Sequence, residues 1–248
     1  MARRTDDPAV AVLAALSADI VGCRACPRLV AWREQVARDR RAAYRDEEYW
    51  GKPVPGFGDP HASVLLLGLA PAAHGGNRTG RIFTGDRSGD WLFAALFRAG
   101  YANRPVSERD GDGLVLRDAY VAAAVRCAPP ANHPTPDERD RCAPFLAREL
   151  DALRAVRVIV TLGNFAYDAL WRVLQGRGEM LPKPRPRFAH GLEVATPRYT
   201  ILGCYHPSQQ NTFTGRLTEP MLDAVFGRAR ELSGEGQPRT SARSSLAK

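Results

Sequence analysis

The chain has 248 residues, of which 44% are hydrophobic and 25% are charged, so it is long enough to bury one substantial core. Its formal net charge is +8, almost entirely from arginine, which favours a polyanionic partner such as nucleic acid. No apolar run reaches 18 residues and no secretory signal pattern begins the chain, so we expect a cytoplasmic protein without membrane association. Five cysteines in a reducing compartment argue against a disulfide framework.

Apolar spacing alternates helices with buried strands along most of the chain. Ser88 and Thr135 are expected to cap two of the helices, with Pro136 in the first turn of the second. The sequence predicts an α/β fold of three αβα layers around a central four-stranded, mostly parallel sheet. We expect helices at 8–20, directly after Cys26, and at 88–101, 135–153 and 164–174, with strands at 63–69, 117–127, 156–163 and 196–208.

The domain organisation follows from the same pattern. We expect one domain over residues 1–232 and a disordered tail over 233–248, which is rich in Gly, Ser and charge. Ligands of parallel sheets bind outside the carboxyl ends of the strands, so the loops after Leu69, Arg126 and Tyr205 should converge there. A monomer is expected.

Four of the five cysteines form two pairs, Cys23 with Cys26 and Cys127 with Cys142. A two-residue spacer lets two sulfurs hold one metal ion or two corners of a cluster, and the second pair would complete four ligands. Burial as ordinary core thiols is the plain alternative, and spacing alone does not separate zinc from iron-sulfur. Cys204 lies inside a predicted strand and is expected in the core.

Two further motifs accompany the cysteines in a fixed order. They are GLAPAAHGGNRTGRIFTGD, which starts at Gly68, and YHPSQQNTFTGRLT, which starts at Tyr205. Over residues 20 to 230 the chain resembles the family 5 (type B) uracil-DNA glycosylases, relatives of the iron-sulfur family 4 enzymes. The resemblance implies DNA containing uracil or another damaged base as partner, and a 4Fe-4S cluster on Cys23, Cys26, Cys127 and Cys142.

The resemblance also implies roles for residues of both motifs. His206 is the first catalytic candidate, because its N–H could donate to a carbonyl oxygen of the leaving base. Phe83 is expected to stack on a flipped base, and Asn77 and Asp86 to orient the attacking water, although Asp86 could equally cap the next helix. The remaining expectations are substrate contacts by Gly68, Ala70, Ala73, His74, Ala123, Ser208 and Asn211, and DNA contacts by Arg78, Arg81, Gln210 and Arg216.

Two departures from the family 4 pattern bear on specificity. Family 4 enzymes carry Glu where this chain has Leu69, and Asn where it has Ala123. We therefore expect a broader choice of deaminated or damaged bases, such as hypoxanthine. No lysine lies in a motif, so a Schiff-base lyase step is disfavoured and the product should be an abasic site.

Two other classes of protein remain open from the residues alone. A non-catalytic nucleic-acid-binding module with a structural zinc would keep the cysteines and the basic charge but would not need His206. An iron-sulfur electron carrier is the second, although the glycines after the first strand lack the G-x-G-x-x-G dinucleotide pattern.

Overall fold

The computed structural model describes residues 7–234, which fold around one mixed β-sheet. The strand order is β1-β3-β2-β4-β6-β5, and the inner four strands run parallel. This confirms the predicted parallel core and adds a short antiparallel strand at each edge. The strands are β1 (Phe57–Gly58), β2 (Val64–Gly68), β3 (Ala119–Ala123), β4 (Val158–Leu162), β5 (Glu193–Ala195) and β6 (Thr200–Cys204).

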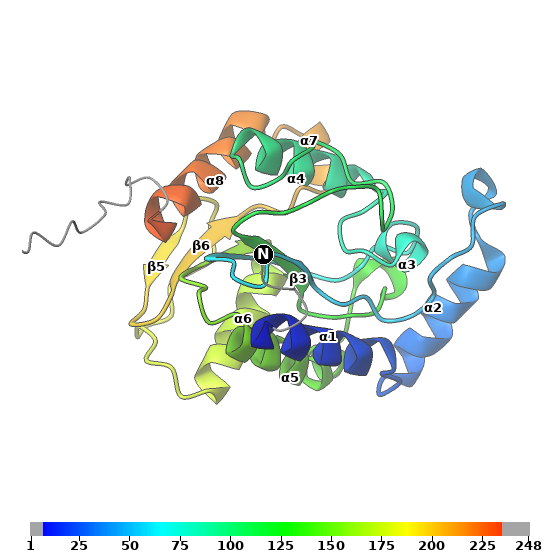
Figure 1. Ribbon diagram of the computed structural model, residues 1–248, viewed down its shortest axis with the longest axis horizontal. Coiled ribbons are helices and arrows are strands. Elements are labelled where there is room, and N and C mark those ends of the chain that lie inside the picture. The colour runs from blue at the N-terminus through cyan, green and yellow to red at the C-terminus, as the bar shows by residue number, and fades with distance from the viewer. Residues whose placement is uncertain (1–6, 235–248) are drawn as a thin grey trace, which may run out of the picture.

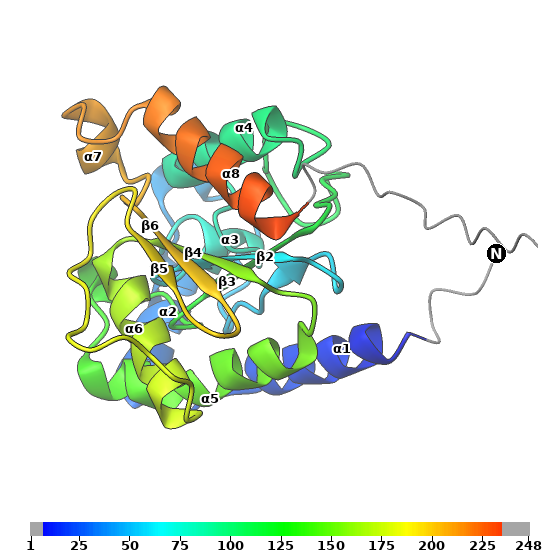
Figure 2. The same ribbon diagram turned by 90° about the vertical axis from the view of Figure 1, so that its left-hand side faces the viewer.

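Helices cover both faces of the sheet, which gives the predicted three layers. Figures 1 and 2 show α4 and α8 on one face and α1, α5 and α6 on the other. Two short helices lie in the loops that follow β2 and β6. The helices are α1 (Pro8–Val21), α2 (Pro27–Asp39), α3 (Gly76–Thr79), α4 (Arg87–Arg98), α5 (Pro136–Ala152), α6 (Asn164–Gly176), α7 (Gln209–Phe213) and α8 (Glu219–Ser233), with 3-10 turns at Ala42–Tyr44 and Pro130–Asn132.

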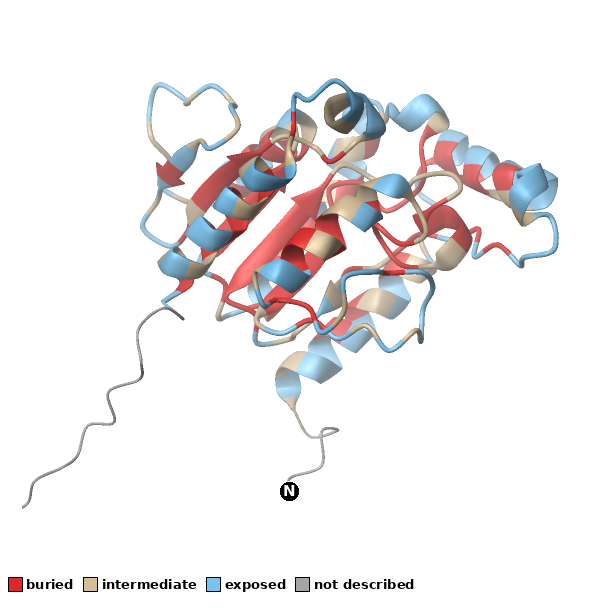
Figure 3. Ribbon diagram, turned by 90° about the horizontal axis from the view of Figure 1, so that it is seen from above, coloured by how far each residue is buried: buried red, intermediate tan, exposed pale blue. Residues whose placement is uncertain are grey.

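The inner strands are apolar because helices bury both of their sides. Every residue of β2, β3 and β4 is buried, and these strands are red throughout in Figure 3. Alternate side chains enter opposite layers: Leu66 and Val160 pack under α4 and α8, whereas Leu65 and Ile159 pack against α5 and α6. The sheet is therefore a rigid base for the loops at its carboxyl edge.

The helix ends confirm one predicted cap and correct another. Thr135 and Glu138 form a complete capping box at the start of α5. Helix α4, in contrast, begins at Arg87 and is capped by Asp86, whose carboxylate accepts a hydrogen bond from the Gly89 amide at 3.0 Å. Ser88 lies inside the first turn, so its predicted capping role is wrong.

The predicted domain boundary is close to the end of the last helix. Helix α8 continues to Ser233, and residues 235–248 of the predicted tail lie outside the described residues. Within residues 7–234, no helix is both long and apolar enough to cross a bilayer. The expectations of a monomer and of a cytoplasmic location stay predictions.

Candidate active site and cysteine cavity

Two loops meet at the carboxyl edge of the parallel strands. We call residues 69–86, after β2, the first loop and residues 205–216, after β6, the second loop. Phe83 of the first loop and His206 of the second pack together, with ring centroids 5.7 Å apart. Gly68 at the end of β2 lies under the Phe83 ring, because a Cβ at this position would be 2.7 Å from two ring carbons. The predicted stacking and catalytic candidates thus pack against each other.

His206 is set deep at this edge although part of its surface remains accessible. Burial lowers the pKa of its imidazole to about 4, so the ring is neutral at pH 7. Gly163 at the end of β4 makes room for it, since a Cβ there would be 3.3 Å from the His206 Cβ. A neutral imidazole still has one N–H, so this residue can donate a hydrogen bond without carrying charge.

Asp86 closes the first loop and is both a helix cap and a candidate acid-base group. One carboxylate oxygen accepts from Gly89. The other, Oδ2, lies beside Gly75, where an added Cβ would come within 2.1 Å. Burial raises the pKa of Asp86, and the backbone amides of Gly89 and Ser88 oppose this shift. The Asp86 carboxylate therefore lies against Gly75 of the motif. The same carboxylate caps α4, as the alternative prediction stated.

Asn77 and Arg78 of the first loop point into the protein. The Asn77 side chain is fully buried, and its amide donates to the Arg33 carbonyl oxygen at 3.1 Å. Arg78 donates to the carbonyl oxygens of His74 and Gly85 and pairs with Glu47. Both side chains therefore hold the loop in place. The predictions that Asn77 orients water and that Arg78 contacts DNA do not fit the burial of these side chains.

Arg81 is the second buried arginine of the first loop and is also a correction to the predicted DNA contacts. Its guanidinium donates to the hydroxyl of Ser107 at 2.8 Å and to the carboxylate of Asp112 at 2.5 Å. Both side chains of this ion pair are under 10% exposed. Burial alone would raise the pKa of Asp112, but Arg81 and nearby backbone amides lower it far below its ordinary value. The pair fixes the loop just before Phe83.

The second loop is much more exposed than the first. Ser208 caps α7, and the Asn211 amide donates to the His206 carbonyl oxygen at 2.8 Å. None of the five residues of α7 is buried. Gln210 and Arg216 lie at the surface, with the Arg216 guanidinium 4.6 Å from the centre of the Tyr205 ring. The loop thus presents polar groups beside His206, and their contacts with substrate and DNA stay predictions.

The other residues predicted to contact substrate lie in three places: the end of β3, the cluster beside the cysteines, and the first loop. Ala123 pairs with Gly68 in the sheet register and is buried at the end of β3. Ala70 packs against the apolar cluster that contains three of the cysteines. Ala73 is half-buried in the first loop, and His74 beside it shares a hydrogen bond of 3.0 Å with the Tyr49 hydroxyl.

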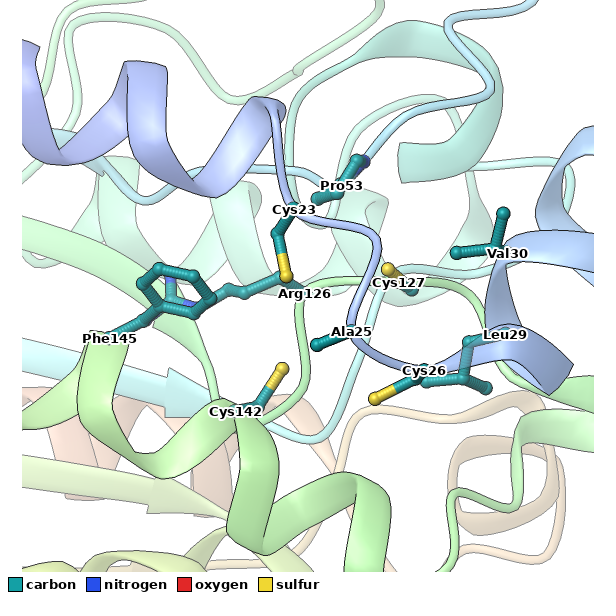
Figure 4. Close-up of a pocket in the computed structure, with 10 residues that line it drawn as sticks. All are labelled: Cys23, Ala25, Cys26, Leu29, Val30, Pro53, Arg126, Cys127, Cys142 and Phe145. Atoms are coloured by element: carbon teal, nitrogen blue, oxygen red, sulfur yellow. The ribbon is translucent and has the colours of Figure 1, made fainter.

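A separate cavity lies behind the first loop and is lined by four cysteines. Figure 4 shows the sulfur atoms of Cys23, Cys26, Cys127 and Cys142 around one shared space. The first two come from the turn into α2, the third follows β3, and the fourth lies on α5. Cys204 is fully buried in β6, apart from this group, as predicted. The structure therefore unites both predicted pairs.

A buried, positively charged arginine beside this cavity favours negative charge on the cysteine sulfurs. Burial raises the pKa of the Cys127 thiol to about 12 and that of the Cys142 thiol to about 11, so these are neutral thiols without a bound cation. Behind Cys127 lies the guanidinium of Arg33, which is 2% exposed and donates to the Cys127 sulfur at 2.9 Å. Metal-bound thiolates would supply the negative charge that this arginine lacks when the thiols are neutral.

Sequence reasoning missed three residues that shape these sites. Tyr49 orients His74, Asp112 holds Arg81, and Arg33 contacts Cys127. No sequence signal marks them, because each is separated from its partner by 25 to 94 residues along the chain.

Comparison with known proteins gives a consistent result. The family model of the uracil DNA glycosylase superfamily matches residues 55–230. A Type-5 uracil-DNA glycosylase of Mycobacterium bovis is 54% identical over 221 residues, which cover 88% of this chain and 81% of that relative. A Type-5 uracil-DNA glycosylase of Thermus thermophilus is 50% identical, covering 87% and 95%. A Type-4 uracil-DNA glycosylase of Archaeoglobus fulgidus is 27% identical, covering 75% and 84%.

Proposed function

The chain belongs to the uracil-DNA glycosylase superfamily and, within it, to the type-5 uracil-DNA glycosylases. From this premise we propose that it hydrolyses the N-glycosyl bond of uracil and of other deaminated bases in DNA. The observation that carries the proposal is the packing of a neutral, deeply set His206 against Phe83 at the carboxyl edge of the sheet. A non-catalytic DNA-binding module would have no use for this arrangement.

The reaction requires access to the base and stabilisation of the charge that leaves with it. The enzyme must rotate the nucleotide out of the duplex, which costs least for a mispaired or damaged base. The bond between C1′ and the base nitrogen then breaks and its electron pair stays on the base. Water adds to C1′ and loses a proton, so the products are the free base and an abasic site.

In this proposal, His206 and Phe83 hold the departing base. The N–H of the neutral His206 ring donates to a base carbonyl oxygen, where negative charge develops as the bond breaks. An imidazole with a pKa near 4 keeps this role without a proton transfer at neutral pH. Phe83 is 5% exposed and packs with the core, so stacking on a base requires its ring to be uncovered when the nucleotide enters. We propose that its apolar ring then contacts any planar base.

Asp86 is the group best placed to handle the water. Its Oδ2 faces the glycine segment of the first loop rather than the helix that Oδ1 caps. A carboxylate in this position can accept a hydrogen bond from water and take up its proton as the water adds to the sugar. With Asn77 buried, Asp86 carries this task alone among the predicted pair.

A broad choice of bases follows from the residues at the strand ends. Gly68 and Ala123 lie side by side at the ends of β2 and β3, and neither has a polar side chain that could read a base edge. Selection would then depend on how readily a nucleotide leaves the duplex, which favours deaminated bases in mismatched pairs. Hypoxanthine is the clearest test base beside uracil.

We further propose that the four cysteines of the cavity hold a 4Fe-4S cluster. Within residues 7–234, no three Cys, His, Asp or Glu side chains converge closely enough to hold a single metal ion. A structural zinc needs its sulfurs about 2.3 Å from one centre, whereas a cluster spreads them over four corners. When bound, the cluster would supply a structural tie among α2, α5 and the loop after β3.

The cluster proposal is tested by spectroscopy and metal analysis of freshly purified protein. We expect a broad absorbance band near 400 nm and about four iron and four sulfide per chain. Colourless protein with one zinc per chain would replace the cluster by a structural zinc.

Base release from synthetic duplexes tests the activity itself. Duplexes with one uracil or one hypoxanthine opposite a defined base are incubated with the enzyme, and abasic sites are then cleaved by alkali. We expect strand cleavage with both bases in the wild type. His206→Ala should lower kcat at least about 100-fold while DNA affinity changes by less than about threefold.

A matched histidine variant controls for general damage. His61 is exposed and pairs with Asp7 at the opposite end of the sheet, so His61→Ala should keep full activity. Absence of abasic sites on every damaged base would refute the proposed activity. Equal losses in affinity and turnover for His206→Ala would instead assign this residue to DNA binding.

A further inference from the structure

Helix α2 buries an arginine against the cysteine cavity without giving it a carboxylate partner. Arg33 is 2% exposed, and its Nη1 lies 2.9 Å from the Cys127 sulfur and 3.4 Å from the Cys23 carbonyl oxygen. Within the part of the chain that the structure describes, it forms no ion pair with Asp or Glu, and its buried Nε–H has no hydrogen-bond acceptor. A buried cation in this state is strongly unfavourable unless an anion is present.

The other arginine at this cavity shows the contrast. Arg126 lines the cavity and is also buried, but both of its terminal nitrogens bind the carboxylate of Glu149. The charge of Arg126 is therefore neutralised within the protein. The charge of Arg33 is directed at the sulfur of Cys127. The Nε–H groups of both arginines lack an acceptor in the described residues, so the two differ in the partners of their terminal nitrogens.

Arg33 also contacts the first loop, but through its backbone. Its carbonyl oxygen accepts the hydrogen bond from the Asn77 amide, and the Asn77 carbonyl oxygen accepts from the Gly51 amide at 3.0 Å. The same residue thus supports the active-site loop with its main chain and faces the cysteine cavity with its side chain. A side-chain substitution alters the second contact and retains the first.

We propose that Arg33 is a positioning residue that sets the reduction potential of the iron-sulfur cluster through its charge and its N–H···S bond to Cys127. This inference rests on the proposed cofactor. Positive charge and hydrogen bonds to ligand sulfur favour the more electron-rich form of a cluster, and therefore raise its potential. The Arg33 guanidinium provides both in one buried contact, whereas Arg126 reaches Cys142 with its backbone and pairs its charge with Glu149.

The test is a redox titration of the loaded protein, followed by absorbance and electron paramagnetic resonance in both the oxidising and the reducing direction. Arg33→Gln removes the charge and should change the ratio of reduced to oxidised cluster at a fixed potential at least about tenfold toward the oxidised form. For a one-electron couple this is a shift of about 59 mV toward negative values. Arg33→Lys keeps the charge and should shift less.

Arg38→Gln is the matched control, because Arg38 lies on the same helix but is exposed and donates a hydrogen bond to Gln35. Its potential should equal that of the wild type. An unchanged potential in loaded Arg33→Gln would overturn the inference and leave the cofactor proposal intact. A wild-type protein without iron and sulfide would overturn the cofactor proposal itself.

Loading provides a second readout if Arg33→Gln does not retain its cluster. Recovery of iron and visible absorbance in Arg33→Lys would then support the need for positive charge behind Cys127. Empty cavities in both variants, with folded protein by circular dichroism, would show that shape and not charge is required, which contradicts the inference.

Discussion

The first and second loops meet where Phe83 packs against His206 but are held in opposite ways. The first loop is fixed from inside by Arg78 and Arg81, whose guanidinium groups are buried and bonded to the protein. The second loop is exposed, and the Asn211 amide and the Ser208 cap hold it close to the sheet. Arg216 of this loop stays at the surface, stacked on Tyr205.

This difference separates two uses of arginine within similar motifs. In the first loop, buried arginines hold the backbone that carries Phe83. In the second loop, the Arg216 guanidinium is exposed, and we propose that it contacts phosphate groups of DNA. The first loop should therefore be sensitive to changes in folding stability, and the second to changes in DNA affinity.

Breaking the buried ion pair of the first loop should give the largest effect. Arg81→Met leaves the Asp112 carboxylate buried and unpaired, which we expect to lower the unfolding free energy by about 3–5 kcal/mol. Urea denaturation monitored by circular dichroism measures this loss. Arg216→Met is the matched control and should change stability by less than about 0.5 kcal/mol. Similar stabilities for the two variants would remove the distinction between the loops.

The pH dependence of stability tests the burial of His206 at the base of the second loop. Its native pKa of about 4 lies below the unfolded value of about 6.5, so the unfolded chain binds more protons between these values. Stability should fall as the pH falls from 6.5 to 4. Between pH 7 and pH 4.5 the wild type should lose about 2 kcal/mol more than His206→Asn. Parallel curves for the two proteins would show that the ring is not buried in solution.

A methyl group under the Phe83 ring should disturb the packing of Phe83 against His206. The added Cβ of Gly68→Ala would displace the ring, so we expect kcat/KM for uracil release to fall about tenfold, or about 1.4 kcal/mol in the barrier. Gly227→Ala in α8 is the control, because a Cβ there meets no atom within 4 Å. Activity equal to that of the control would mean that the Phe83 ring is not needed in its observed place.

Removing the surface arginine of the second loop should have the smallest effect. Arg216→Gln should weaken DNA binding a few-fold and lower the salt dependence of the binding constant by about one phosphate contact. Fluorescence anisotropy at several salt concentrations measures both. Arg148 of α5 pairs with Asp19 of α1, on the face of the sheet that α1, α5 and α6 cover, so Arg148→Gln should leave both values unchanged. An unchanged salt dependence for Arg216→Gln would exclude a phosphate contact.

The sequence predicted the elements whose signals are local. Four buried strands, the Thr135 cap of α5 and the helices after the first three of these strands could be read from apolar spacing and capping residues. Helices α7 and α8, which follow the fourth, were not predicted. The edge strands β1 and β5 have two and three residues, too few for any periodicity to appear. Their existence depends on pairing with β3 and β6, which is a tertiary property.

The burial of the motif arginines could not be predicted from the sequence. A guanidinium group normally lies at the surface, and burial becomes favourable only when a distant carboxylate is brought beside it. Asp112 follows Arg81 by 31 residues, and Glu47 precedes Arg78 by the same separation. His206, Phe83 and the four cysteines were predicted because motif order, rather than pairing, marks them.

The order in which the cavity residues appear along the chain has a consequence for biosynthesis. Cys23 and Cys26 are translated early, but Cys142 on α5 follows them by more than 110 residues. The cavity therefore does not exist on the nascent chain until more than half of the protein has been made and β2 and β3 have paired. Any centre held by all four cysteines must therefore be completed late in synthesis, after α5 has been made.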